Sequence, residues 1–69
     1  MKLSARNQIP AKVIAVTAGE ATANVELDAF GSRLVASITV EAANELKLAP
    51  GREVTVIIKA SDVIVGVAD

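Results

Sequence analysis

The residues of this chain that could do chemistry are donors of positive charge and hydrogen bonds. A lysine, a small residue and a hydroxyl stand together at Lys59–Ser61, and a serine and an arginine flank an alanine at Ser4–Arg6. A third donor group is the expected start of a helix at Thr39–Ala43, where backbone N–H groups lack partners. Because every oxygen of a tetrahedral dianion accepts hydrogen bonds, each of these groups could contribute to a site for a small inorganic anion. Each also has a simpler explanation: a solvated turn at Lys59–Ser61, a solvated charge at Arg6, and helix capping at Thr39.

No residue pattern indicates catalysis. The chain has no histidine and no cysteine, which removes the commonest general base and the easiest nucleophile. Glu26 and Asp28 share the outward face of an expected strand, where a solvated surface explains them. Glu41 and Glu45 lie one turn apart on the expected helix and have the same explanation, and Asp62 suits a turn. We therefore expect no enzymatic activity and no structural zinc.

Length and composition indicate one small domain, residues 1–69, that assembles with other copies. A chain of this size buries only about 60% of its unfolded surface, and small domains usually need a disulfide or a metal. This chain has no cysteine and a single aromatic residue, Phe30, yet 52% of its residues are hydrophobic. Apolar residues in excess of a small core point to burial between subunits. We expect an obligate homo-oligomer.

Charge and hydropathy argue against nucleic acid and membrane as partners. The net charge is −1, and proteins that bind single strands combine a basic groove with aromatic platforms, of which Phe30 would be the only one. No apolar run approaches the ~18 residues that span a bilayer. Residues 1–10 also lack the apolar core of a signal peptide. We expect a cytoplasmic protein.

The hydrophobic pattern predicts an all-β fold with one short helix. Val54–Ile58 is apolar on both faces, as in a strand covered on two sides, and Ala21–Asp28 alternates with its odd-numbered residues inward. Pro10 belongs at a strand start or on an edge. The expected elements are strands Lys12–Ala18, Ala21–Asp28 and Arg33–Ile38, a helix Val40–Lys47 capped by Thr39, and strands Val54–Ile58 and Val63–Val67. This is the element order of a five-stranded barrel of the OB type.

Four short motifs extend this interpretation. They are SARNQ at residues 4–8, SIT at 37–39, LAPG at 48–51 and IKAS at 58–61. In this order and at this spacing they resemble the Mop domain, the molybdate-binding module of the molbindins. Related modules occur in molybdate-responsive regulators and, as the TOBE type, in transporter ATPases. The resemblance covers essentially the whole chain, as in a free-standing molbindin.

The resemblance implies an OB-like barrel that assembles into a hexamer, a trimer of dimers. It implies that molybdate or tungstate binds between subunits, for molybdenum storage and homeostasis, without catalysis or an organic cofactor. In the family, one type of site combines the SAR segment of one subunit with the helix start and KAS segment of another. Carried over by position, the site residues are Ser4, Ala5, Arg6, Thr39, Ala42, Lys59, Ala60 and Ser61. Ala42 stands where the family commonly has serine, so a backbone N–H would have to replace a hydroxyl there.

Two other functions fit the same fold. The chain could be an oligomeric interaction module that binds no oxyanion. It could also be an OB-type nucleic-acid binder, which the composition favours less. Titration with molybdate separates these alternatives from an oxyanion store.

Overall fold

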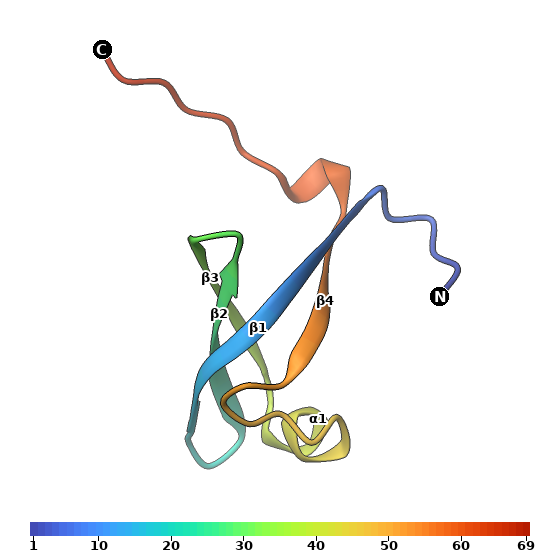
Figure 1. Cartoon of the computed structure of the whole chain (residues 1–69), viewed down its shortest axis with the longest axis vertical. Coiled ribbons are helices and arrows are strands. Elements are labelled where there is room, and N and C mark those ends of the chain that lie inside the picture. Colours follow the sequence, from blue (N-terminus) through green and yellow to red (C-terminus); the bar gives the residue numbers. More distant parts are fainter.

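The fold is a four-stranded antiparallel sheet with one short helix. The computed structural model describes all 69 residues, and the sheet order is β3-β2-β1-β4 (Figure 1). The elements are β1 (Asn7–Ala18), β2 (Thr22–Ala29), β3 (Ser32–Thr39), α1 (Val40–Glu45), β4 (Glu53–Ile58) and the 3-10 turn η1 (Ala60–Asp62). The prediction of a mainly β fold with one short helix is confirmed. The six-residue α1 is far too short to cross a membrane, and there is no longer helix.

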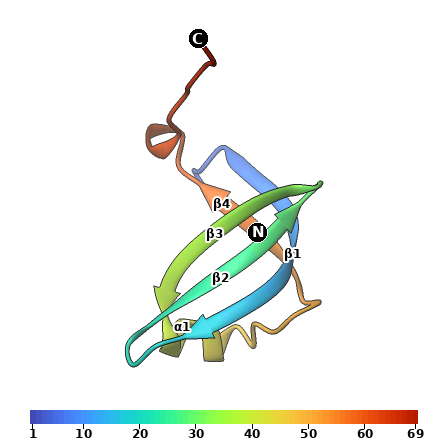
Figure 2. The same ribbon diagram turned by 90° about the vertical axis from the view of Figure 1, so that its left-hand side faces the viewer.

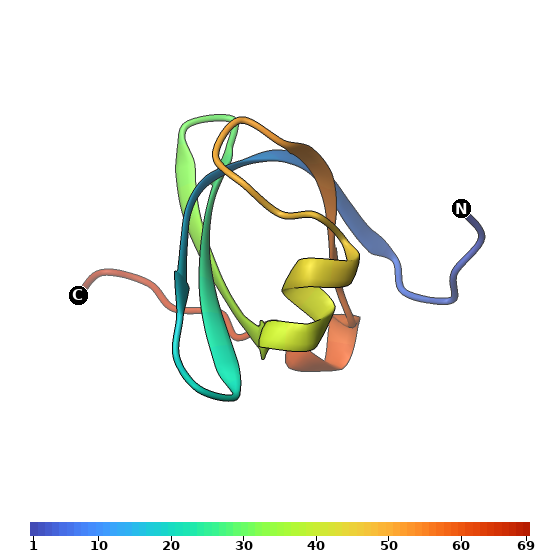
Figure 3. The ribbon, with the colours of Figure 1, turned by 90° about the horizontal axis from the view of Figure 1, so that it is seen from below.

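Strand β1 bends between the two ladders in which it takes part. Its first half pairs with β4 from Asn7 to Lys12, and its second half pairs with β2 from Lys12 to Ala18. The register shifts between Val13 and Ala15, where Ile14 is the extra residue of a β-bulge, and bulges bend their strands. Strands β1, β2 and β3 therefore form one curved face (Figure 2). With β4 they make an incomplete barrel that has α1 at one end (Figure 3).

The first strand begins five residues earlier than the sequence predicts. Asn7–Ala11 pairs with β4, and Pro10 lies opposite Thr55 in that ladder. At Pro10 the other side of β1 is free, because pairing with β2 starts only at Lys12. A proline, which lacks an N–H, is tolerated at such a local edge.

The core is small and centres on β1 and β2. Val13, Val25 and Leu27 form its buried cluster, and only six of the 69 residues are fully buried. The predicted alternation in β2 is confirmed at Ala23, Val25 and Leu27, whereas Ala21 lies before the strand and is exposed. The second face of β4 is also open, since Ile57 is exposed. This much burial leaves many apolar side chains without cover in a single chain.

The predicted fifth strand, Val63–Val67, is not formed within the chain. Residues 63–69 have no strand partner and extend away from the sheet (Figure 1). Their β-type composition alone cannot make a strand, because a strand also needs a neighbouring edge for its backbone hydrogen bonds. The single chain therefore has an open, four-stranded sheet, and the five-stranded barrel stays a prediction.

The helix begins where the sequence predicts and ends earlier. Thr39 is the N-cap, but α1 stops at Glu45 rather than Lys47. Lys47 has a φ of 54° and donates its N–H to Asn44 O, while Leu48 N–H donates to Ala43 O. These two bonds make a Schellman motif, in which glycine is the usual residue at the left-handed position.

Replacing Lys47 with glycine should therefore stabilise the protein. A non-glycine residue in the left-handed region costs about 1 kcal/mol, and Lys47→Gly removes that cost without removing a core contact, since Lys47 is exposed. We expect a higher midpoint of urea unfolding at a fixed protein concentration. Lys47→Ala is the control, since it also removes the charge but keeps a β-carbon; equal midpoints for both variants would contradict this account.

Candidate functional site

Two of the three predicted donor groups leave the sheet at the same end of one chain. The ladder between β1 and β4 pairs Asn7 with Ile58 at its outer end. Ser4–Arg6 directly precedes Asn7, and Lys59–Ser61 directly follows Ile58, so both groups emerge from the same end of the sheet. Figure 1 shows the chain entering β1 and leaving β4 there. The motifs at opposite ends of the sequence are thus brought together by antiparallel pairing.

Asn7 fixes the two segments to each other. Its side-chain Nδ2 donates a hydrogen bond of 3.1 Å to the carbonyl oxygen of Ile58, at a partly buried position. Asn7 is part of the SARNQ motif, but it was not among the predicted site residues. The sequence contained one indication of this role: Asn7 belongs to the SARNQ motif, and asparagine side chains commonly form hydrogen bonds with nearby backbone groups.

Arg6 shapes the amino-terminal segment. Its Nε donates to Ser4 O at 3.0 Å, and Nη2 donates to Leu3 O at 2.9 Å. A guanidinium has five N–H donors, so these two bonds leave donors available for another acceptor. Gln8 supports the same loop through a bond from Nε2 to Ala5 O at 3.1 Å. Arg6 is therefore held near the chain end while its charge stays exposed.

The Lys59–Ser61 segment offers a cation and a turn of exposed backbone. Lys59 precedes η1 without capping it, and all three residues are exposed. The first amides of such a helical turn have no acceptor within the turn. The one ion pair of the chain joins Arg33 to Glu26, so neither Arg6 nor Lys59 is neutralised by a carboxylate. An anion could therefore meet two unpaired positive charges at this end.

The third predicted group, the helix start, lies at the opposite end of the domain. Thr39 pairs with Thr22, and β2 in turn brings this region beside Ala18, the far end of β1 from Asn7. Figure 1 places α1 and η1 at opposite ends of the molecule. One chain therefore cannot bring Thr39–Ala42 and Lys59–Ser61 to a single anion.

The donors at the helix start are partly used within the chain. The hydroxyl oxygen of Thr39 accepts a 3.0 Å hydrogen bond from the N–H of Ala42. Val40 N–H donates to Ala21 O at 2.9 Å. The Ala42 N–H, which the sequence suggested as a substitute for a missing hydroxyl, is thus engaged in capping. The hydroxyl hydrogen of Thr39 can still be donated.

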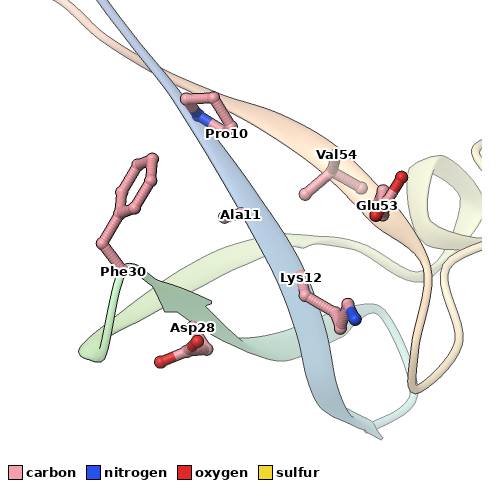
Figure 4. A pocket seen from close by; sticks show the side chains of 7 residues that line it. All are labelled: Pro10, Ala11, Lys12, Asp28, Phe30, Glu53 and Val54. Carbon is pink, nitrogen blue, oxygen red and sulfur yellow. The ribbon is translucent and has the colours of Figure 1, made fainter.

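The largest hollow of the chain does not suit a dianion. It has a volume of about 320 Å³ and is lined by Pro10, Ala11, Lys12, Asp28, Phe30, Glu53 and Val54 (Figure 4). Lys12 stands opposite Asp28 in one ladder and opposite Glu53 in the other. Two carboxylates outweigh one ammonium group, so the local charge repels an anion. None of the predicted site residues lines this hollow.

The sequence of this chain is similar to a known domain family and to several of its members. Residues 3–65 match the TOBE domain. The chain belongs to the TOBE domain family. A probable molybdenum-pterin-binding protein of Haemophilus influenzae is 43% identical over 68 residues, which cover 97% of this chain and 99% of the relative. Molybdenum-pterin-binding protein 3 of Clostridium pasteurianum is 39% identical, with 94% and 97% covered. The resemblance to the molbindins is confirmed.

Solved structures of similar proteins agree with this TOBE domain in fold. A molybdate-binding protein from Sporomusa ovata superposes with a TM-score of 0.90 at 38% identity, covering 94% of this chain and 97% of that one. The cytoplasmic molybdate-binding protein ModG, in a form with molybdate bound, gives a TM-score of 0.84 at 41% identity. This chain covers 43% of ModG, and the match includes 87% of this chain.

The bond from Asn7 to Ile58 should contribute measurably to the stability of this TOBE domain. Asn7→Ala removes a partly buried hydrogen bond and leaves the Ile58 carbonyl without that donor, which typically costs about 1 kcal/mol. We expect a lower free energy of unfolding in urea. Gln8→Ala is the control, because the Gln8 bond is exposed and local in sequence. A loss from Gln8→Ala as large as that from Asn7→Ala would show that Asn7 has no special role.

Proposed function

We propose that this TOBE domain binds molybdate, and the similar tungstate ion, between copies of the chain. The binding would serve molybdenum storage and homeostasis in the cytoplasm, without an organic cofactor and without catalysis. The observation that carries the proposal is the meeting of Ser4–Arg6 and Lys59–Ser61 at one end of the β1–β4 ladder. The membership of a family whose relatives include molybdate-binding proteins supports the choice of ligand.

The charge of the ligand explains why these residues are needed. A dianion that leaves water for a protein interface loses hydration, and compensating positive charge is needed to offset that cost. Arg6 and Lys59 supply positive charge beside the small residues Ala5 and Ala60, which leave space for an anion. Ser4 and Ser61 add hydroxyl donors to the same group.

The need for more than one copy follows from the distance between donor groups. Thr39 and Ala42 lie at the end of the domain opposite to Lys59. A site that uses both must therefore take its helix start and its Lys59–Ser61 segment from different copies. This supports an oligomer, and we propose the hexamer built as a trimer of dimers that the molbindin resemblance implies.

Removing either cation should weaken molybdate binding. A charge-assisted hydrogen bond contributes about 1.5–3 kcal/mol, so Lys59→Ala and Arg6→Ala should each lower the affinity by roughly tenfold to a hundredfold. Calorimetric titration with molybdate, tungstate, sulfate and phosphate measures the affinities and the selectivity. Lys47→Ala is the matched control and should change the affinity little, since it is the same kind of substitution at an exposed cation near the end of α1, outside the proposed site. Unchanged affinity in both site variants would put the site elsewhere.

A mixture of the two site variants provides a second readout. If one anion takes Arg6 from one copy and Lys59 from another, co-refolded mixtures of Arg6→Ala and Lys59→Ala should regain a fraction of intact sites. If both side chains come from the same copy, mixing restores nothing. The titration of the mixture therefore distinguishes a shared site from one within a single chain.

The assembly itself should be visible without any anion. Light scattering at micromolar concentration should give a mass several times the 7.1 kDa of one chain, because six buried residues leave most apolar side chains in need of cover. A stable, folded monomer under these conditions would contradict the proposal. An oligomer that binds none of the four anions would instead favour an interaction module.

A further inference from the structure

Side chains hold the segment before β1 through three consecutive carbonyl groups. The guanidinium of Arg6 donates to Leu3 O at 2.9 Å and to Ser4 O at 3.0 Å. The next carbonyl, that of Ala5, accepts a 3.1 Å hydrogen bond from Gln8 Nε2. The segment has no strand partner, because β1 begins only after it. Its conformation therefore depends on these three side-chain hydrogen bonds.

These hydrogen bonds determine where the backbone N–H groups of the segment point. A trans peptide is planar, and its C=O and N–H groups point in opposite directions. The chain has no cis peptide bond. Leu3 O and Ser4 O both point to the guanidinium of Arg6. The N–H groups of the two following residues, Ser4 and Ala5, therefore both point away from the guanidinium, to one side of the segment.

The N–H groups of this segment are available to a ligand. No hydrogen bond within the chain uses the N–H of Ser4, Ala5 or Arg6. The chain bends at Ser4 and at Arg6, and successive N–H groups of a turn can bind an anion together. The hydroxyl of Ser4 is a further donor in the same short segment. The segment thus offers an anion several neutral donors in addition to the charge of Arg6.

We infer that Gln8 is a positioning residue of the proposed anion site. Its side chain contacts the segment rather than the anion, and through Ala5 O it holds the free N–H groups in a fixed arrangement. The backbone of Gln8 pairs with Ile57 in the β1–β4 ladder. The side chain therefore extends to the segment from a point that strand pairing keeps in place. The inference rests on the proposed function and adds to it a residue outside the predicted site.

The hydrogen bond from Gln8 should matter more for binding than for stability. It is exposed and joins residues only three apart, so it contributes little to the stability of the folded domain. A segment that is free before binding must be ordered when the ligand arrives, and that loss of conformational entropy lowers the affinity. With Gln8 and Arg6 in place, the segment is ordered when the domain folds. Loss of the Gln8 bond transfers part of this entropy loss to the binding step.

Replacement of Gln8 by methionine tests this role. Gln8→Met keeps the length of the side chain and removes its N–H donors. Calorimetric titration of the assembled protein with molybdate should give an affinity lower by about threefold to tenfold, the range that corresponds to one neutral hydrogen bond. The midpoint of urea unfolding should stay at that of the parent. Thr17→Val is the matched control, since it removes an exposed polar group at the far end of the same strand and should change neither quantity.

Nuclear magnetic resonance provides a readout that a general loss of stability would not change. In the parent protein, molybdate should shift the amide-proton resonances of Ser4 and Ala5, because their N–H groups donate to the anion. Without any anion, the backbone order parameters of these two amides should be lower in Gln8→Met than in the parent. The order parameters within β1 should be the same in both proteins.

The outcomes separate this inference from the proposed function. A parent protein that binds no molybdate would overturn both. A parent that binds molybdate without shifts at Ser4 and Ala5 would overturn the inference alone. The same holds for a Gln8→Met variant with the affinity or the order parameters of the parent. A Gln8→Met variant whose urea midpoint falls together with its affinity would show that Gln8 acts through stability, and would also overturn the inference.

Discussion

The antiparallel ladder between β1 and β4 is the interaction on which the rest of this structure depends. It joins residues near the two ends of the sequence, and it leaves Ser4–Arg6 and Lys59–Ser61 at a common edge. The β-bulge at Ile14 lets β1 turn from this ladder to the one with β2. The two ladders therefore occupy successive halves of β1, on either side of this bend. Strand β1 thus both places the two donor segments and gives the sheet its curvature.

Much of the fold could be predicted because local and tertiary preferences agree. Alternation in β2 predicted its buried face, and Thr39 predicted the start of α1 through its capping side chain. The early start of β1 was not predicted because Asn7 and Gln8 are polar and do not show a strand pattern. They are part of the strand because they pair with Ile58 and Ile57 of β4. The end of α1 was predicted wrongly because Lys47 adopts a left-handed conformation, which the sequence does not indicate for a lysine.

The candidate site was predictable in composition but not in arrangement. The resemblance to the Mop domain identified the three donor groups, whose hydroxyl groups, backbone N–H groups and cations are suitable partners for an anion. No pattern in one sequence could reveal that Thr39 lies at the far end of the domain from Lys59, because that distance follows from strand register. The Val63–Val67 strand was expected for a sound local reason, its β-type composition. Composition does not show whether the chain offers this segment a neighbouring edge, and within one chain it does not.

The exposed segment Val63–Val67 also bears on how an isolated chain behaves in solution. Five consecutive residues of β-type composition without a charge lie in water, and the sheet has two open edges, at β3 and β4. Exposed apolar segments and open strand edges are the features through which chains add to one another in aggregates. The isolated chain is therefore the state of this protein that is most prone to aggregation.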